Sequence, residues 1–391
     1  MDHSTNDTPY SRWPNLVAGK QLKSSKGLER PTIGLLSGEG IGPELTAAAE
    51  MVLKALSETL GTQFDIRHGG IIGDAATNAS GSPLTDDVRR FCEDVFQQGG
   101  AVLAGPGGGR FVYDCRRSFN LFCKLNPLVT DKVLRNCGVI KPDHLNQVDI
   151  MVVRENLGGV YQGHWSESRS ASGDRQASHS FHYEQDRVSR IANVAARFAA
   201  KRRGMLTLVI KPNGVPSISQ LWLDCTTKVA EQNNLSLRVL EVDFAGYHLI
   251  DAPQEHDVIL TSNLFGDLLA DLGGILLGSR GLCYGASFSE TGSAIYQTNH
   301  GAAHDLANTD RANPIAHLRA LAMLLQESLG LQQEAIRLWQ AMIQTLENRF
   351  RTFDIMEPDC KLVSTREMVR CISAAICENS QTARSSSSTF A

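Results

Sequence analysis

Several features typical of secreted, membrane or nucleic-acid-binding proteins are missing from this sequence of 391 residues. Its nine cysteines are scattered singly without a CxxC pair, a pattern typical of reduced thiols in a cytoplasmic protein rather than of a disulfide framework. The formal net charge of -4 leaves no basic excess for nucleic acid. No apolar run reaches membrane-spanning length, and residues 1–30 lack the apolar segment of a signal peptide. We therefore expect a cytoplasmic protein with neither a nucleic-acid nor a membrane partner.

The chain between its two ends has the patterning of a globular α/β protein. Its length exceeds one ordinary core, which favours two domains. Apolar strands such as 206–210 alternate with amphipathic helices such as 187–204, so we expect a mostly parallel sheet. Residues 1–30 and 379–391 should lie outside the fold, as a flexible extension and a disordered tail.

The stretch from Asp257 to Ser279 carries the strongest signal for a site. An apolar strand, Val258–Leu260, is followed by a helix on which Asp267 and Asp271 share one face. Two carboxylates this close raise each other's pKa unless a cation lies between them, and oxygen ligands suit Mg²⁺ or Mn²⁺ rather than zinc. A solvated acidic pair is the plain alternative. The surrounding Leu, Ala and Gly residues favour a metal site.

Two glycine-rich loops follow short apolar strands. Loop 38–42 joins strand 32–36 to a helix and could approach a cofactor, but it lacks the full GxGxxG pattern and is weak evidence alone. Loop 105–109 leads into a segment that contains the cations Arg110, Arg116, Arg117 and Lys124. Aromatic residues between them indicate a partly buried, strand-like segment whose guanidinium groups need anionic partners. A solvated basic face is the alternative.

The segment 164–185 differs from its surroundings. It is polar, rich in Ser and His, and has no apolar period. We expect it to form a protruding hairpin or arm, in which His179 and His182 are solvated.

Several separated motifs occur in one order along residues 31–378: GEGIGPE (38–44), RENLGGVYQG (154–163), NLFGDLLADLGG (263–274), GSRGL (278–282) and HGAAHDLANTDRANP (300–314). Together they resemble the metal-dependent β-decarboxylating dehydrogenases, which include isocitrate, isopropylmalate, homoisocitrate and tartrate dehydrogenases. The resemblance implies an isopropylmalate dehydrogenase-like α/β fold with two domains and the active site in the cleft between them. Residues 31–126 plus 277–378 would form the large cofactor-binding domain, and residues 127–276 the small domain for metal binding and dimerisation.

The resemblance implies a role for each residue that matches a family motif. Tyr161 and Lys211 correspond to the acid–base pair, whose pKa values must be lowered for work near neutral pH. The residues implied to hold Mg²⁺ or Mn²⁺ are Asp243, Asp267 and Asp271. In a homodimer, Lys211 and Asp243 would be supplied to the partner's site. The residues implied to bind NAD are His300, Gly301, Asp305, Leu306 and Asn313. The residues assigned to the substrate are Arg110, Arg116, Lys124, Asn126 and Arg154.

These roles predict NAD-dependent, metal-dependent oxidative decarboxylation of a 3-substituted malate, a small 2-hydroxy acid, to a 2-oxo acid and CO₂. The sequence also departs from the family. Asn126 stands where most relatives have an arginine, and Lys124 replaces a usual asparagine. Arg110 lies where isocitrate-type relatives place a small polar residue, so it could bind a carboxylate or phosphonate on C3, or else point to solvent.

Two other functions stay open at this point. One is a tartrate- or malate-type dehydrogenase with a small polar side group on its substrate, against which Arg110 and Tyr113 argue. The other is a non-catalytic regulatory subunit, which the Asn126 departure favours. The presence of Tyr161, Lys211 and the three aspartates argues for an enzyme.

Overall fold

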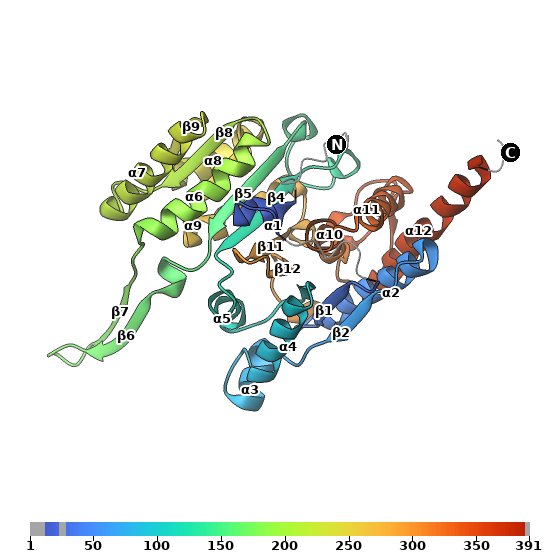
Figure 1. Ribbon diagram of the computed structural model, residues 1–391, viewed down its shortest axis with the longest axis horizontal. Coiled ribbons are helices and arrows are strands. Elements are labelled where there is room, and N and C mark those ends of the chain that lie inside the picture. The colour runs from blue at the N-terminus through green and yellow to red at the C-terminus, as the bar shows by residue number, and fades with distance from the viewer. Residues whose placement is uncertain (1–11, 23–28, 388–391) are drawn as a thin grey trace.

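The computed structural model describes residues 12–22 and 29–387, and its centre is one ten-stranded sheet (Figure 1). In spatial order the strands are β2 (Asp65–His68), β1 (Thr32–Leu36), β3 (Ala101–Ala104), β12 (Ala294–Thr298), β11 (Tyr284–Phe288), β4 (Cys123–Val129), β5 (Asp149–Glu155), β10 (Val258–Thr261), β8 (Met205–Ile210) and β9 (Ser236–Glu241). The central pairs β12–β11, β11–β4 and β4–β5 are antiparallel, and the outer pairs are parallel. The predicted mixed α/β fold with a mostly parallel sheet is confirmed.

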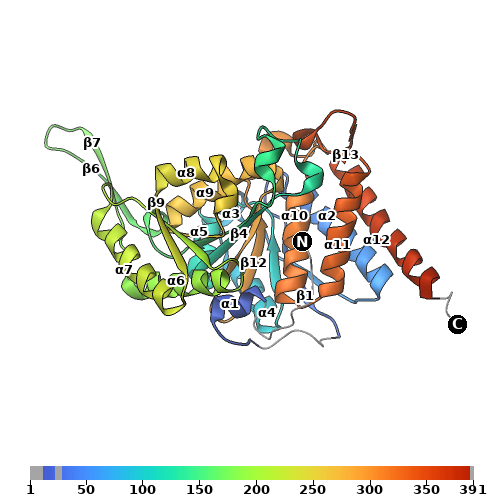
Figure 2. The ribbon, with the colours of Figure 1, turned by 90° about the horizontal axis from the view of Figure 1, so that it is seen from above.

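Helices cover this sheet. They are α1 (Trp13–Ala18), α2 (Gly42–Leu60), α3 (Gly73–Ser80), α4 (Asp86–Gln97), α5 (Phe111–Ser118), α6 (Gln185–Ala200), α7 (Pro216–Gln232), α8 (Val242–Asp251), α9 (Asn263–Leu277), α10 (Ile315–Met323), α11 (Gln332–Glu347) and α12 (Thr365–Ser387). The neighbouring strands β5, β10, β8 and β9 have helices on both faces. Helices α8 and α9 lie on one side of them, and α6 and α7 lie on the other (Figure 2). The sheet runs unbroken through both predicted domains, and β4 crosses the predicted boundary at residue 126. The division into two domains stays a prediction.

The predicted strand and helix between Asp257 and Ser279 form β10 and α9. All four residues of β10 are buried, and α9 packs closely on β4 and β5 because it carries glycine where it meets them. A Cβ atom added at Gly266 would lie 2.8 Å from a side-chain carbon of Arg154. A Cβ atom at Gly273 would lie 2.4 Å from Leu128. This close approach brings the acidic face of α9 beside the polar end of β5.

The cation-rich segment forms a helix where we predicted a strand. Phe111 and Cys115 are four residues apart and both buried, so they form the inward face of α5. Phe111 and Tyr113 are two positions apart, as on one face of a strand, but the buried residues are four positions apart, as on one face of a helix. The strand period begins only at β4, which carries Lys124 and Asn126.

The predicted arm is confirmed. Residues 164–180 form a two-stranded antiparallel hairpin, β6 (His164–Arg169) and β7 (Arg175–Ser180), whose residues are all exposed. It extends away from the rest of the molecule (Figure 1).

Part of the N-terminal region belongs to the fold, so the prediction of a flexible extension is wrong for residues 12–22. Leu16 and Val17 of α1 are buried, and the Trp13 ring packs edge-on against Phe198 of α6. Arg197 of α6 donates hydrogen bonds to the carbonyl oxygens of Leu16 and Val17. A six-residue helix is too short to show a period in the sequence. Residues 1–11 and 23–28 lie outside the described residues.

The C-terminal region also differs from expectation. Helix α12 extends to Ser387, although a disordered tail was predicted from residue 379. Residues 388–391 lie outside the described part of the chain. The mean composition of such a segment predicts disorder, but a helix that is already formed continues by adding one hydrogen bond per residue.

The cysteines and helices of the described ranges agree with the composition. No disulfide joins the cysteines of residues 12–22 and 29–387, as their scattered spacing predicts. Across the same residues, none of the helices combines the length and the apolar character that a membrane crossing requires.

Glu327 should give the stability of this fold a pH dependence. It lies in a π-helical turn, Leu324–Ser328, and its Oε2 accepts a hydrogen bond of 2.6 Å from the backbone N–H of Trp13. Burial raises the pKa of Glu327 from 4.5 to about 7, although Arg12 and the hydrogen bond oppose the shift. The folded state therefore binds more protons than the unfolded state between these two pH values. We expect the free energy of unfolding to fall by on the order of 3 kcal/mol as pH rises through this window.

The variant Glu327→Gln tests this expectation by urea unfolding at pH 4, 6 and 8. The free energy of unfolding of the wild type should fall across this range, and the contribution of Glu327 to this fall should be missing from the variant. Glu347→Gln, at an exposed position at the end of α11, is the control and should keep it. Identical pH profiles for the wild type and Glu327→Gln would contradict the assignment.

Candidate active site

Three buried cationic side chains form one cluster where β4, β5 and α5 meet α9. Lys124 of β4 is the cross-strand partner of Arg154 in β5, and Arg116 comes from the last turn of α5. Their exposed fractions are 5%, 1% and 4%. The sequence assigned all three to the substrate, and the structure brings them together.

One carboxylate faces this cluster directly. Asp267 pairs with Nη1 of Arg154 and accepts a hydrogen bond of 3.0 Å from the hydroxyl of Tyr161. Asn263, at the start of α9, holds the same guanidinium group through Nε and Nη2, at 3.1 and 2.8 Å. Asp271, one turn further along α9, is exposed and pairs with Nε of Arg280 at 3.1 Å.

The cluster has more positive charge than its own acceptors satisfy. Burial, then the charge of Arg154, lowers the pKa of Arg116 to about 9. Burial and the two arginines also lower the pKa of Lys124 well below its ordinary value. Nε and Nη1 of Arg116 are buried without a hydrogen-bond partner, and such a group costs about 1–3 kcal/mol or more when charged. The arrangement therefore suits an anionic ligand that carries more than one oxygen.

Tyr161 lies in a 3₁₀ turn, Val160–Gln162, at the edge of this cluster. Burial, then the charge and hydrogen bond of Asp267, raises its pKa to about 12. Arg154 acts in the opposite direction and lowers this pKa. The lowered pKa that was expected from a nearby metal cation stays a prediction. The phenol keeps its proton at neutral pH.

Lys211 and Asp243 form a separate pair near the far edge of the sheet. Lys211 follows β8, and Asp243 lies in the first turn of α8. The Lys211 ammonium donates hydrogen bonds of 2.8 Å to Asp243 and to Glu241, which raise its pKa. The same pair lowers the pKa of Asp243. In the part of the chain that the structure describes, no three His, Cys, Asp or Glu residues are placed to hold a metal ion. One chain thus presents two of the three predicted ligands on α9, and Asp243 apart from them.

The predicted NAD-binding residues lie on a loop that packs against the glycine loop 38–42. The N–H of Ile41 donates to the carbonyl of Ala302 at 2.9 Å, and Leu306 packs beside Ile41. Asp305 and Gly301 are exposed. The carboxyl ends of β1, β3 and β12, which are parallel neighbours, lead into these loops, and ligands of open α/β sheets bind at such ends.

The other two predicted NAD-binding residues point into the protein. Asn313 donates to Asp354 at 3.1 Å and accepts from the N–H of Ile315 at 3.0 Å. Nδ1 of His300 lies 3.0 Å from the carbonyl of Gly301, and its Nε2 is buried without a partner. The loop therefore offers an exposed carboxylate, that of Asp305, whereas the unpaired Nε2 of His300 is buried.

The remaining two substrate candidates have other partners. Asn126 is fully buried and donates to Asn299 at 2.9 Å, so it joins β4 to the end of β12 and adds no charge to the cluster. Arg110 donates to the backbone carbonyl of Tyr161 at 3.2 Å.

Sequence reasoning also missed contacts made by the arm. His179 was expected to be solvated, but its Nε2 lies 2.6 Å from the carbonyl of Val160. Trp165 stacks on Arg110. Contacts of a polar hairpin leave no periodic signal, so the sequence could not have revealed them.

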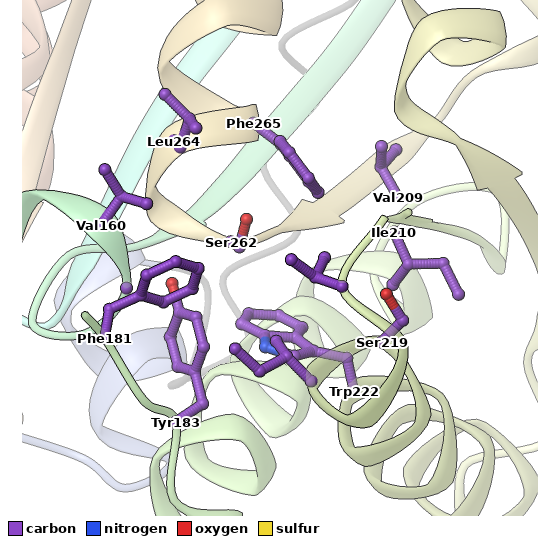
Figure 3. Close-up of a pocket in the computed structure, with 13 residues that line it drawn as sticks. Val160, Phe181, Tyr183, Val209, Ile210, Ser219, Trp222, Ser262, Leu264 and Phe265 are labelled. Atoms are coloured by element: carbon purple, nitrogen blue, oxygen red, sulfur yellow. The ribbon is translucent and has the colours of Figure 1, made fainter. Parts of the chain in front are cut away.

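An apolar pocket lies beside the Lys211 end of β8 (Figure 3). Its lining includes the edge-to-face rings of Tyr183 and Trp222, together with Phe265 and Ile210. Ser219 and Ser262 are its polar residues, and it contains no charged side chain. It does not suit a malate, and it is separate from the cation cluster.

A family model described as isocitrate/isopropylmalate dehydrogenase matches residues 32–372. The 3-isopropylmalate dehydrogenases of Geobacillus kaustophilus and Thermosynechococcus vestitus are each 36% identical to this chain, over 88% and 86% of its length and 95% and 96% of theirs. The crystal structure of isocitrate dehydrogenase from Methylococcus capsulatus is similar with a TM-score of 0.78 and 28% identity, over 89% of this chain and 99% of that chain.

Proposed function

Because the chain belongs to the isocitrate/isopropylmalate dehydrogenase family, we propose that it is an NAD-dependent, divalent-metal-dependent enzyme. The proposed reaction is the oxidative decarboxylation of a 3-substituted malate to a 2-oxo acid and CO₂. The observation that carries this proposal is the buried cluster of Arg116, Lys124 and Arg154, which faces the single carboxylate of Asp267. A malate has two carboxylates, which would satisfy the unpaired guanidinium nitrogens.

The proposed metal site fits the donor chemistry of α9. Asp267 and Asp271 supply oxygen ligands on one helix face, which suits Mg²⁺ or Mn²⁺. The third ligand would be Asp243 from a second copy of the chain. When bound, the ion would lower the pKa of the substrate hydroxyl and stabilise negative charge on that oxygen.

Different residues of this chain would then bind the substrate, accept a proton and donate a proton. Arg116, Lys124 and Arg154 would bind the two malate carboxylates and fix the orientation of C2 and C3. Lys211, from a second copy, would accept the hydroxyl proton at Nζ as hydride leaves C2 for NAD. Tyr161 would donate its hydroxyl proton to C3 after CO₂ departs, a role that the position of this hydroxyl supports, since it lies 3.0 Å from Asp267 at the edge of the cation cluster. Lys211 could act as a base only after Asp243 turned away from it, since that contact raises the pKa of Lys211.

A homodimer would supply the missing residues. Helices α8 and α9 expose a group of large apolar side chains, Phe244, Tyr247, Leu268, Leu272 and Ile275. The rings of Phe244 and Tyr247 stack with their centroids 6.3 Å apart. Exposed apolar groups of this kind mark protein interfaces. We propose that a second copy covers this face, which lies next to Asp243.

An activity screen with Mn²⁺ and NAD tests the proposed reaction. Substrates should include malate, tartrate, 3-alkylmalates, and malates with a carboxylate or phosphonate on C3. We expect equal amounts of NADH and CO₂ from at least one 3-substituted malate. NADH formation without CO₂ would indicate a simple hydroxy-acid dehydrogenase, and a lack of turnover with every substrate would overturn the proposal.

Asp305 should make the enzyme prefer NAD to NADP. Its exposed carboxylate could accept hydrogen bonds from the ribose hydroxyls and would repel a 2′-phosphate. Cofactor preference is the value of kcat/KM for NAD divided by that for NADP. Replacing Asp305 by lysine should lower this preference by about tenfold or more, because it removes one charge-assisted hydrogen bond to the ribose. Glu290→Lys makes the same charge change at another exposed position and should leave the preference unchanged. Equal efficiency of the wild type with both cofactors would show that Asp305 lacks this role.

A further inference from the structure

The turn that carries Tyr161 is held mainly from outside. Within Val160–Gln162 and its flanks, the backbone bonds are those from Gln162 to Gly159 and from Gly163 to Val160, at 3.0 and 3.2 Å. Other elements hold each of the three residues. His179 of the arm bonds the carbonyl of Val160. The external contacts of Gln162 come from α5, through the side chain of Arg117 at 2.7 Å and the carbonyl of Tyr113 at 3.3 Å.

Arg110 holds the central residue of this turn. Its Nη2 donates a hydrogen bond of 3.2 Å to the backbone carbonyl of Tyr161. Its guanidinium carbon lies 4.8 Å from the ring centroid of Trp165 in the arm and 5.1 Å from that of Tyr113 in α5. The Tyr113 ring in turn packs against the Tyr161 ring, with centroids 5.3 Å apart. Arg110 therefore joins the arm, α5 and the turn at one point.

The Arg110 guanidinium group already has partners for its charge: two aromatic rings and one carboxylate. Both of its neighbouring rings attract a cation through their π faces, and Asp114 lies 4.0 Å from its Nε. Within the cation cluster, it is Arg116 that has buried nitrogens without a hydrogen-bond partner. Arg110 is thus better placed to fix the backbone of Tyr161 than to bind an anionic group on the substrate.

We propose that Arg110 is a positioning residue, which holds the Tyr161 hydroxyl where it can deliver its proton to C3. This inference rests on the proposed function, because it takes Tyr161 as the proton donor. The Tyr161 hydroxyl is 3.0 Å from Asp267, on the side of the cation cluster. A displacement of the turn by about 1 Å would move the proton away from the reacting carbon, and such misplacements cost about a hundredfold in rate.

We call the contacts of Arg110 with Tyr161, Trp165 and Tyr113 the clamp. The variant Arg110→Met, which keeps the apolar stem and removes the donor, tests the clamp in two ways. Hydrogen–deuterium exchange of the purified chain should show faster exchange of the amides of Gln162 and Gly163, which close the turn. Kinetically, kcat should fall about ten- to a hundredfold with little change in KM, by the same factor for a malate with an anionic group on C3 and for a 3-alkylmalate. Arg110→Lys, which restores one donor and the charge, should recover part of both effects.

A second measurement isolates the proton transfer. In D₂O, the wild type should exchange the C3 protons of the 2-oxo acid product, and Arg110→Met should slow this exchange as much as it slows turnover. Trp165→Leu removes one of the two rings at an exposed position and should give a smaller effect in the same direction, even if Arg110→Met fails to fold. Arg175→Met in the arm is the matched control, because Arg175 is exposed and pairs with the exposed Glu167 at 3.3 Å; this variant should resemble the wild type.

The outcomes separate the clamp from the proposed function. A wild type that turns over no malate would overturn both the proposed function and the role of Arg110 in it. An active wild type whose amide exchange, kcat and C3 proton exchange are unchanged in Arg110→Met would overturn the clamp alone. A selective rise in KM for the anionic substrate, with unchanged kcat, would show instead that Arg110 binds the side group.

Discussion

Replacing Asp267 by asparagine is expected to abolish turnover while leaving the chain folded. Asp267 is the carboxylate that faces the three buried cations, it accepts a hydrogen bond from the Tyr161 hydroxyl, and it is a proposed metal ligand. Loss of metal-based charge stabilisation removes several kcal/mol of transition-state stabilisation. We therefore expect kcat to fall by about a thousandfold or more.

Metal removal and a matched variant complete this test. Excess chelator should remove the activity of the wild type, and added Mn²⁺ should restore it, whereas Asp267→Asn should stay inactive at every Mn²⁺ concentration. Asp251→Asn removes an exposed carboxylate at the end of α8 and should retain full activity. Circular dichroism should show the same helix content in all three proteins. Full wild-type activity in excess chelator would contradict the metal site.

Mixing two inactive variants is expected to restore about a quarter of the wild-type activity. Lys211→Met should lower kcat about a hundredfold or more, as loss of a general base does. When Lys211→Met and Asp267→Asn chains are unfolded, mixed and refolded, half of the dimers should contain one chain of each kind. Each mixed dimer has one site with both residues intact, because Lys211 and Asp267 of one site come from different chains under the proposed arrangement.

The position of Lys211 in the structure supports this expectation. Its ammonium bonds to Asp243 and Glu241, and no hydrogen bond or ion pair joins it to Asp267 or Tyr161 within the described chain. Mixing either variant with Asp251→Asn serves as the control for refolding. Recovery only to the sum of the two parent activities would show that each chain builds its site alone. It would also remove the main reason for placing the interface on α8 and α9.

The parts of the site that could be read from the sequence are those on regular elements with long apolar patterns. The strand before Asp267, the helix that carries it and the strand that precedes Lys211 are all where the pattern places them. Burial on both faces fixes such elements locally, so their polar ends can be located without knowledge of the rest of the chain. Which of these ends come together still depended on the resemblance to a family.

The parts that could not be read depend on contacts between distant, irregular segments. Arg110 was assigned to the substrate because of its position in the family pattern, but its guanidinium lies against Trp165, which belongs to the arm. His179, in the same hairpin, contacts the carbonyl of Val160 in the turn that carries Tyr161. Neither contact leaves a periodic trace. The helix at Phe111–Ser118 was missed for another reason, since eight residues give barely two turns of pattern.

The docking of α1 has a consequence for the order in which the chain folds during synthesis. Trp13 bonds to Glu327, which is 314 residues later in the sequence, and Leu16 bonds to Arg197, 181 residues later. At ribosomal rates of about 5–20 residues per second, roughly 15–60 seconds pass between the synthesis of α1 and that of Glu327. Over this interval the apolar side chains of α1 have no completed surface to cover them, and contacts this distant in sequence form late. Protection of Leu16 and Val17 from a protease added to translating ribosomes should therefore mark the moment at which α6 and the turn of Glu327 are both in place.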